Sequence, residues 1–418
     1  MNAGADAWAA WEQHIRPSAL PPQSYAAGLA ADPAALPPPA TIPPREWLYG
    51  SRLIRRFVSV LAAPGGVGKS ALALGQALAL ATGRPFLGER VHHSAPAWVF
   101  NLEDPLDEMH RRLAALMMLH GIADAEVSGR LFLNTGRLRR LVMAEPDGDG
   151  GIALPDQAPM IAAARAGGIG LIVVDPFVKS HRLDENSNVH MDAAATAWAE
   201  VADQAACAVL LVHHVRKGAA ESVDATRGAK ALTDAARSAS LLAAMTAEEA
   251  GALGVPERER WRHVRLDDAK ANLAPRAETA KWYRLESVSL GNGSVLYPLG
   301  DAVGAIAPWT PPSPFRDLSG RDCNRALDAI AAGHEGHAFT RHRTGRAAGR
   351  WAGGVLEQLF GFAPDEAARV LAIWLKTGLL VEEEYRHPEQ RKARLGLKVV
   401  DAKRPTVAHK KEENGDAE

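Results

Sequence analysis

The stretch Ala63-Pro64-Gly65-Gly66-Val67-Gly68-Lys69-Ser70 decides how the first half of this 418-residue chain folds. It follows an apolar run, Phe57 to Ala62, that predicts a β-strand, and it precedes an Ala- and Leu-rich run, Ala71 to Ala81, that predicts a helix. A glycine-rich turn between a strand and a helix is the context that a phosphate-binding loop, or P-loop, requires. Ala63 stands where the full pattern has a glycine, so the match lacks one residue.

Each residue type in this loop has a role in holding phosphate. The glycines let backbone N–H groups close around phosphate oxygens at the N-terminus of a helix. Lys69 supplies a compact positive charge, and the hydroxyl of Ser70 is a ligand for Mg²⁺. Residues Ala63 to Ser70 therefore predict a site for ATP together with Mg²⁺.

From Arg45 to about Gly300, short apolar runs alternate with longer Ala-rich stretches. This alternation is typical of β-α units that build a largely parallel sheet. The predicted strands are Phe57–Ala62, Ala97–Leu102, Leu131–Thr135, Leu171–Asp175, Ala208–His213 and Ser240–Ala244. The later runs Trp261–Leu266 and Trp282–Leu290 alternate more and predict antiparallel strands at the sheet edge. The expected fold class is an α/β P-loop core with a mainly parallel sheet.

Two of the predicted strands end in carboxylates. Ala97 to Leu102 is followed by Glu103 and Asp104, and a carboxylate beside a P-loop can polarise the water that attacks the γ-phosphate. We assign Glu103 to this catalytic role and Asp104 to the N-cap of the next helix. Leu171-Ile172-Val173-Val174-Asp175 has the Walker B pattern, so Asp175 is expected in the Mg²⁺ shell. Apolar strands ending in Asp are common, and the weight of this one comes from following a P-loop.

A histidine pair, His213-His214, ends a fourth strand. A side chain there can hydrogen-bond the γ-phosphate and pass its presence to the following loop. A lone His pair is more often structural than a sensor. The position on the sheet, and not the residue type, favours the sensor.

The order of these motifs resembles a known family. After the His pair come Arg216-Lys217-Gly218 and then the run Arg227-Gly228-Ala229-Lys230-Ala231-Leu232-Thr233-Asp234-Ala235-Ala236-Arg237. Over about residues 45 to 300 the chain is similar to the RepA-type hexameric helicases of the RecA/DnaB superfamily, which are typical of plasmids and prophages. The resemblance implies a RecA-like ATPase core, ATP and Mg²⁺ as cofactors, single-stranded DNA as partner, a homo-oligomer, expected to be a hexamer, and an initiator or loader protein as a further partner.

The resemblance also implies roles for single residues in the subunit's own site. By matching motif, Lys69 and Ser70 are the phosphate and Mg²⁺ ligands, Glu103 is the catalytic carboxylate, Asp175 is the Walker B acid, and His214 or His213 is the sensor.

Other matching residues are expected to act in a neighbouring subunit. Arg237 resembles the arginine finger that stabilises transition-state charge there, with Arg227 as the alternative. The segment Lys270-Ala271-Asn272 resembles the late Lys-x-Asn element, which gives Lys270 a contact with the neighbour's nucleotide. For any single such residue, a solvated surface cation is the more common reading.

The family fold places the loops after two strands, Leu171–Asp175 and Ala208–His213, on the inside of a ring. Short basic loops suit single-strand phosphates. Their basic residues are Lys179, His181 and Arg182 in the first loop and Arg216 and Lys217 in the second. Trp47 and Tyr49, just before the first strand, either pack on the nucleotide base or belong to the core.

The ends of the chain have different compositions. Residues 1–44 are Pro-rich and predict a mobile arm, 45–305 the ATPase core, 306–320 a linker, and 401–418 a disordered charged tail. Residues 321–400 predict helices followed by a hairpin, the order of a winged-helix-like domain. Its arginines 341, 343, 346 and 350 form either a DNA-contacting stripe or a solvated face, and the sequence favours neither.

The overall composition limits the function classes. A formal net charge of −1 gives no global attraction to nucleic acid, so such a partner must be held by a local patch. The two cysteines, Cys207 and Cys323, lack metal-ligand spacing and fit a reducing cytoplasm. The longest apolar run near a helix, Ser70 to Ala81, is too short to span a bilayer.

These observations predict a ring-forming ATP hydrolase, a DNA helicase or translocase that acts in replication of a plasmid or prophage and hydrolyses ATP at subunit interfaces. The alternative is an ATP-gated DNA-binding regulatory or loader protein that does not unwind DNA. A partition-type ATPase is disfavoured, because that family has a lysine just before the Gly-Gly pair where this chain has Pro64.

Overall fold

The computed structural model describes residues 37–215, 230–275, 279–316, 318–343, 349–386 and 393–406. The chain divides into two units, Met1–Arg45 and Glu46–Glu418. The described part of the first unit contains one 3-10 turn, η1 (Pro39–Thr41). Most of the predicted arm and of the predicted tail lies outside the described residues, as do Arg216, Lys217, Arg227 and Arg346.

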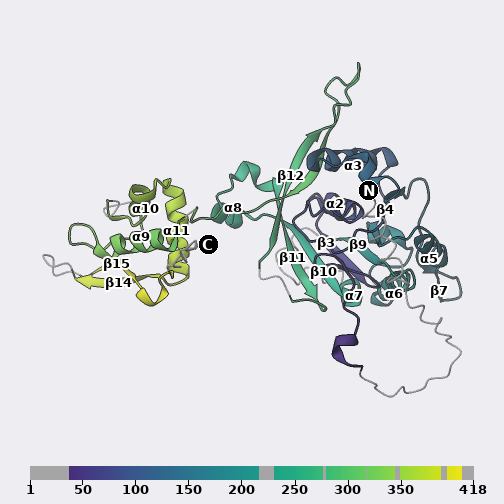
Figure 1. Cartoon of the computed structure of the whole chain (residues 1–418), viewed down its shortest axis with the longest axis horizontal. Helices are drawn as coiled ribbons and strands as arrows, with labels where there is room; N and C mark the ends of the chain where they lie inside the picture. Colours follow the sequence, from purple (N-terminus) through teal and green to yellow (C-terminus); the bar gives the residue numbers. More distant parts are fainter. Residues whose placement is uncertain are drawn as a thin grey trace, which may run out of the picture. The chain divides into compact units, whose positions relative to one another are not determined.

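A nine-stranded sheet organises the second unit (Figure 1). Its order is β13-β12-β11-β10-β3-β9-β8-β4-β5. The strands are β3 (Val58–Ala63), β4 (Ala97–Asn101), β5 (Leu131–Thr135), β8 (Leu171–Asp175), β9 (Ala208–His214), β10 (Ser238–Ala244), β11 (His263–Ala271), β12 (Lys281–Ser289) and β13 (Ala302–Pro308). Neighbours from β10 to β5 pair in parallel, whereas β11, β12 and β13 add antiparallel pairs. The predicted α/β fold with a mainly parallel sheet is confirmed.

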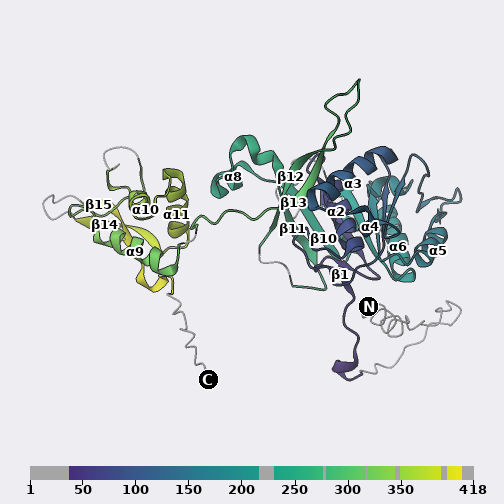
Figure 2. The ribbon, with the colours of Figure 1, turned by 45° about the horizontal axis from the view of Figure 1, so that its top comes forward.

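Helices cover both faces of the sheet, as Figures 1 and 2 show. One face carries α2 (Lys69–Thr82) and α3 (Leu106–His120), and the other carries α5 (Gln157–Ala166), α6 (Asn188–Gln204) and α7 (Lys230–Ala235). A separate apolar core fills each layer, the second one around the fully buried Trp198. Because both faces are covered, β3 and β8 are buried along their whole length.

The sequence did not reveal β13. Its Ala- and Gly-rich run has low β-propensity, and it forms a strand because it pairs with β12 from Tyr283↔Pro308 to Ser289↔Ala302. β13 thereby extends into the segment 306–320 that the sequence predicts as a linker. The tip of the β12–β13 hairpin exposes Val295, Leu296, Tyr297 and Leu299.

The C-terminal part of the chain has its own apolar core. It consists of α9 (Gly320–Ala332), α10 (Gly353–Phe360), α11 (Pro364–Lys376) and the hairpin of β14 (Leu380–Arg386) and β15 (Ala393–Val399). Helices and a hairpin are present as expected, and the winged-helix assignment stays a prediction.

The arginines of the predicted DNA-contacting stripe have partners inside this part of the chain. Arg341 pairs with Glu382 at 3.2 Å and Arg343 with Asp365 at 3.1 Å, while Arg350 donates to the Tyr385 hydroxyl at 2.9 Å. These contacts are what the solvated-face alternative requires of the described arginines.

Short elements complete the description. They are β1 (Trp47–Tyr49), β2 (Leu53–Ile54), β6 (Glu145–Pro146), β7 (Ile152–Ala153), α4 (Asp124–Val127), α8 (Ala247–Leu253), η2 (Phe177–Ser180), η5 (Glu257–Arg262) and η7 (Asp401–Lys403). Tyr49 is fully buried, which places it in the core and not on a nucleotide base. Of the helices in the described ranges, none is long and apolar enough to cross a bilayer.

Candidate functional site

The predicted P-loop joins β3 to α2 at the carboxyl edge of the parallel strands. Gly66 and Gly68 have φ of +84° and +85°, a left-handed conformation that side chains with a Cβ rarely adopt. Gly68 is also the N-cap of α2, and a Cβ there would lie 2.7 Å from Cδ2 of Leu285. The backbone therefore turns tightly and aims the first N–H groups of α2 at the space above the loop.

Lys69, Ser70 and Asp175 come together at this helix N-terminus. Lys69 and Asp175 are 7% and 5% exposed. Burial lowers the pKa of Lys69, and the nearby charges of Asp175 and Glu103 oppose that shift. Burial raises the pKa of Asp175, against the hydrogen bond that it receives from Ser70 and the charge of Lys69. These opposite shifts show two buried charges that depend on each other.

The donor set fits Mg²⁺. A small cavity of about 20 Å³ lies between Ser70 and Asp175, with Asn101 and Arg112 in its wall. It has room for about one water molecule or a small ion, and the hydroxyl and carboxylate oxygens are the ligand types that Mg²⁺ prefers. Among the described residues, no group of three or more His, Cys, Asp or Glu side chains could hold a metal alone. Ser70 and Asp175 would thus hold the ion together with phosphate and water oxygens, and the ion would neutralise phosphate charge.

A turn at the end of β4 positions Glu103. The Oδ1 atom of Asn101 accepts hydrogen bonds from the backbone N–H groups of Glu103 (2.9 Å) and Asp104 (2.7 Å). Arg137 Nε donates to the carbonyl of Glu103 at 3.0 Å. The Glu103 carboxylate is 3.1 Å from the ammonium of Lys179, in η2. The backbone of the predicted catalytic residue is therefore held, and its side chain is paired.

The predicted role of Asp104 is wrong. The N-cap of α3 is Pro105, and it makes no side-chain cap. Asp104 instead pairs with Arg112 at 2.7 Å and accepts from Nδ2 of Asn101 at 3.1 Å. The reason is local: Asn101 draws the Asp104 N–H into the turn, and the carboxylate faces the guanidinium one helical turn or more into α3.

The two histidines have different surroundings. His214 is exposed and pairs in register with Ala63, the first residue of the P-loop. Its pKa is lowered by burial and by Lys69, while Glu103 and Asp175 oppose the shift. Burial lowers the pKa of His213 to about 4, and its ring packs 6.4 Å from that of Phe177. Of the two sensor candidates, His214 is the one that faces the site.

Arg237 and Lys270 lie at the opposite edge of the sheet. The Arg237 N–H donates to the carbonyl of Val58, where β3 begins, and Lys270 pairs with Ala239 near the start of β10. Because β3 rises about 3.3 Å per residue, this edge is about 16 Å from the P-loop. The Lys270 ammonium donates to the carbonyls of Thr233 (2.9 Å) and Asp234 (2.8 Å) at the end of α7. Neither side chain can serve the site of its own subunit.

A polar cleft of about 540 Å³ adjoins the P-loop. Its walls are the loop itself, the residues Glu108, Arg111 and Arg112 of α3, and the segment Asp301–Gly304 at the start of β13. Sequence reasoning missed this wall. Arg112 also lines the cavity beside Ser70, and the Glu108–Arg112 spacing of four residues was the available signal, since it places both on one helix face.

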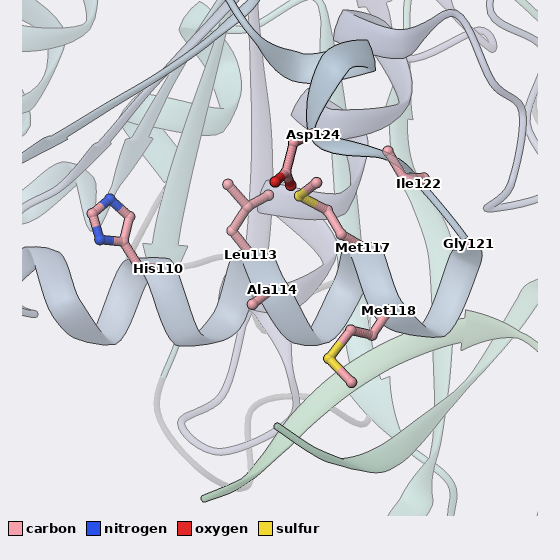
Figure 3. Close-up of a pocket in the computed structure, with 8 residues that line it drawn as sticks. All are labelled: His110, Leu113, Ala114, Met117, Met118, Gly121, Ile122 and Asp124. Carbon is pink, nitrogen blue, oxygen red and sulfur yellow. The ribbon is translucent and has the colours of Figure 1, made fainter. Parts of the chain in front are cut away.

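A second hollow, of about 410 Å³, lies along α3 (Figure 3). Figure 3 shows that it is formed by the side chains of His110, Leu113, Ala114, Met117 and Met118 and by the residues after the helix, Ile122 and Asp124. It contains no residue of the predicted site. Its mainly apolar wall suits no phosphate, so the cleft beside the P-loop is the candidate nucleotide site.

The first predicted DNA loop is only partly available to a ligand. His181 is 7% exposed, and burial lowers its pKa, so it is not a phosphate-binding cation. Arg182 is exposed and pairs with Glu145. Sequence reasoning could not foresee this, because the burial of His181 results from its packing against Phe177.

Residues 30–220 match a family described as an AAA domain. The matched segment contains the P-loop, Glu103, Asp175 and both histidines, and the match supports an ATP-hydrolysing P-loop protein. Among solved structures, the chain is similar to the ATPase domain of a DnaB-like helicase, with 13% identity, a TM-score of 0.40, and coverage of 60% of this chain and 85% of that one. It is also similar to the RadB recombinase, with 13% identity, a TM-score of 0.36, and coverage of 56% and 88%.

Proposed function

We propose that this protein is a RecA-like ATPase that moves along single-stranded DNA as a helicase or translocase and hydrolyses ATP between the subunits of a ring. The observation that carries the proposal is one constellation: Lys69, Ser70 and Asp175 at the N-terminus of α2, with Glu103 and His214 beside them. This set binds phosphate, holds an ion and supplies a carboxylate for an attacking water.

Each residue has a step in the proposed mechanism. Lys69 and the N–H groups of the loop hold the β- and γ-phosphates in the cleft beside α3. Ser70 and Asp175 hold Mg²⁺, which would stabilise the charge that develops on the phosphate oxygens. Glu103 orients the attacking water, and His214, at the end of the neighbouring strand, donates to the γ-phosphate.

The position of Arg237 supports hydrolysis between subunits. A cation is needed at the γ-phosphate to stabilise the transition state. Arg237 lies at the far edge of its own sheet, so in our proposal it enters the site of the next subunit, with Lys270 near it. The proposed assembly is a homo-oligomer, with a hexamer expected from the resemblance to RepA-type helicases.

The proposed role is replication of a plasmid or prophage in the cytoplasm, with an initiator or loader protein as partner. This part rests on the sequence resemblance and on the order of the motifs. The competing hypothesis is a DNA-binding regulator or loader in which ATP only switches assembly.

The decisive experiment measures ATP turnover with and without single-stranded DNA while recording the oligomer size, with Lys69→Ala as the blank. We expect turnover that single-stranded DNA stimulates several-fold in an assembled oligomer, followed by strand displacement from a forked duplex. Slow turnover in a monomer or dimer that ignores DNA would eliminate the motor and favour the ATP-gated binding protein.

A further inference from the structure

An ion pair joins the ends of two neighbouring strands beside the candidate site. Lys179 lies in η2, directly after the strand that ends in Asp175, and Glu103 follows the adjacent strand β4. The Lys179 ammonium is 3.1 Å from Oε1 of Glu103, and the two side chains are 52% and 43% exposed. A solvent-accessible cation therefore holds the carboxylate that the proposed mechanism requires.

This pairing competes with catalysis. A carboxylate that activates water must accept a hydrogen bond from that water, and an oxygen held by an ammonium is directed away from it. Lys69, Asp175 and His214 are the other charged or titratable groups close enough to Glu103 to interact with it electrostatically. Of the cations in this set, Lys179 is the exposed one, since Lys69 is buried in the phosphate loop.

The pair is also weak enough to be exchanged. Exposed ion pairs contribute about 0–1 kcal/mol, so a second anion that reaches Lys179 can displace the carboxylate. Lys179 belongs to the loop that the sequence predicts to face single-stranded DNA. The other basic residues of that loop are occupied elsewhere, because His181 is buried and Arg182 pairs with Glu145.

We propose that Lys179 is a positioning residue that couples single-strand binding to ATP hydrolysis by exchanging Glu103 for a DNA phosphate. Without DNA, Lys179 holds Glu103 away from the attacking water. With DNA, a backbone phosphate takes Lys179, and Glu103 is released to the water. This inference rests on the proposed function and adds to it the residue through which DNA controls the site.

The test compares ATP turnover of the full chain and of Lys179→Ala, with and without saturating oligothymidylate. An ion pair of up to about 1 kcal/mol corresponds to a factor of about 5, so basal kcat of the variant should rise about 2- to 5-fold. The additional stimulation by DNA should shrink by the same factor, with KM for ATP unchanged. Lys179→Arg keeps the cation and should restore low basal turnover and full stimulation.

A matched control removes an exposed ion pair from another place at the same edge of the sheet. Arg139 pairs with Asp156 at 3.2 Å, and Arg139→Ala should leave both rates unchanged. If wild-type protein is stimulated by DNA and Lys179→Ala has the same basal rate and the same stimulation, the coupling role is wrong while the proposed function stands. A lower basal rate with unchanged stimulation would equally overturn it. Absence of stimulation in the wild type would instead contradict the proposed function.

Discussion

At the residue scale, the site contains two carboxylates with different surroundings. Asp175 is buried and bound by Ser70 and Lys69, an arrangement that suits a fixed ligand. Glu103 is exposed and paired with the mobile type of side chain, a lysine, which suits a group that must change partner. Strands that end at the same edge place both acids near the phosphate loop, and burial separates their roles.

The first prediction concerns Glu103. Glu103→Gln keeps the shape and the backbone turn but cannot act as a base, so kcat should fall at least about 100-fold. The affinity for ATP should change little, because Lys69 and the loop remain. Turnover and nucleotide binding are measured separately, with Asp107→Asn, an exposed acid nearby, as the control. A Gln variant that turns over ATP normally would remove Glu103 from the mechanism.

The second prediction concerns His213 and pH. Its folded-state pKa of about 4 lies below the ordinary value of 6.5, so the unfolded chain binds more protons between these values. The stabilisation is complete above pH 6.5 and is lost as the pH falls toward 4. Between pH 7.5 and 5 this residue should contribute about 2 kcal/mol to the loss of stability.

Urea unfolding at the two pH values checks this prediction. His213→Phe, which keeps a ring beside Phe177, should lose correspondingly less stability on acidification than the wild type. His334→Gln alters an exposed histidine and should follow the wild type. Equal losses in all three proteins would show that His213 does not carry this pH dependence.

At the element scale, the ends of the strands determine which side chains meet. The carboxyl ends of β3, β4, β8 and β9 present the P-loop, Glu103, Asp175 and His214 at one edge, because these strands are parallel. The opposite edge presents the start of β10 and the end of β11, where Lys270 closes the C-terminus of α7. Lys270 therefore has a structural role in addition to the proposed contact with a neighbouring subunit.

The third prediction separates these two roles. Lys270→Ala removes charge-assisted hydrogen bonds to the last carbonyls of α7 and should lower the free energy of unfolding by about 1–2 kcal/mol. Arg237→Ala, at the same edge but exposed, should leave it unchanged within about 0.5 kcal/mol. Denaturant unfolding of both variants is the measurement. A Lys270 variant as stable as the wild type would leave its contacts with α7 without energetic weight.

At the scale of the whole molecule, the proposed active site is incomplete in one chain. The phosphate-binding edge and the edge with Arg237 and Lys270 are separated by the length of the central strands. A head-to-tail arrangement would bring unlike edges together, and such contacts generate rings when the rotation closes. The proposed site would then be shared.

The fourth prediction is complementation between two inactive variants. Lys69→Ala and Arg237→Ala should each lose most ATP turnover. Mixed in equal amounts with subunit exchange, about a quarter of the interfaces would pair an intact Lys69 with an intact Arg237, so about a quarter of wild-type turnover should return. The mixture is assayed after exchange and compared with each variant alone. No recovery in mixed oligomers would exclude action of Arg237 across an interface.

Most of the fold could be predicted from the sequence. The buried β-branched runs and the Gly-rich turn are local signals, and each of the predicted parallel strands corresponds to a strand of the sheet. β13 could not be predicted, because its weak pattern becomes a strand only by pairing with β12. Similarly, the wall that α3 and Asp301–Gly304 add to the cleft depends on how the hairpin packs, which no local pattern encodes.

The candidate site divides in the same way. The sequence by itself determined the phosphate loop, the two carboxylates and the histidine pair, because covalent spacing fixes which groups follow a strand. Only the tertiary structure decided that Glu103 is paired with Lys179, that His181 is buried, and that Arg237 is remote from its own P-loop. These outcomes depend on distances and burial between segments far apart in the chain, and such contacts form only when the strands and helices pack together.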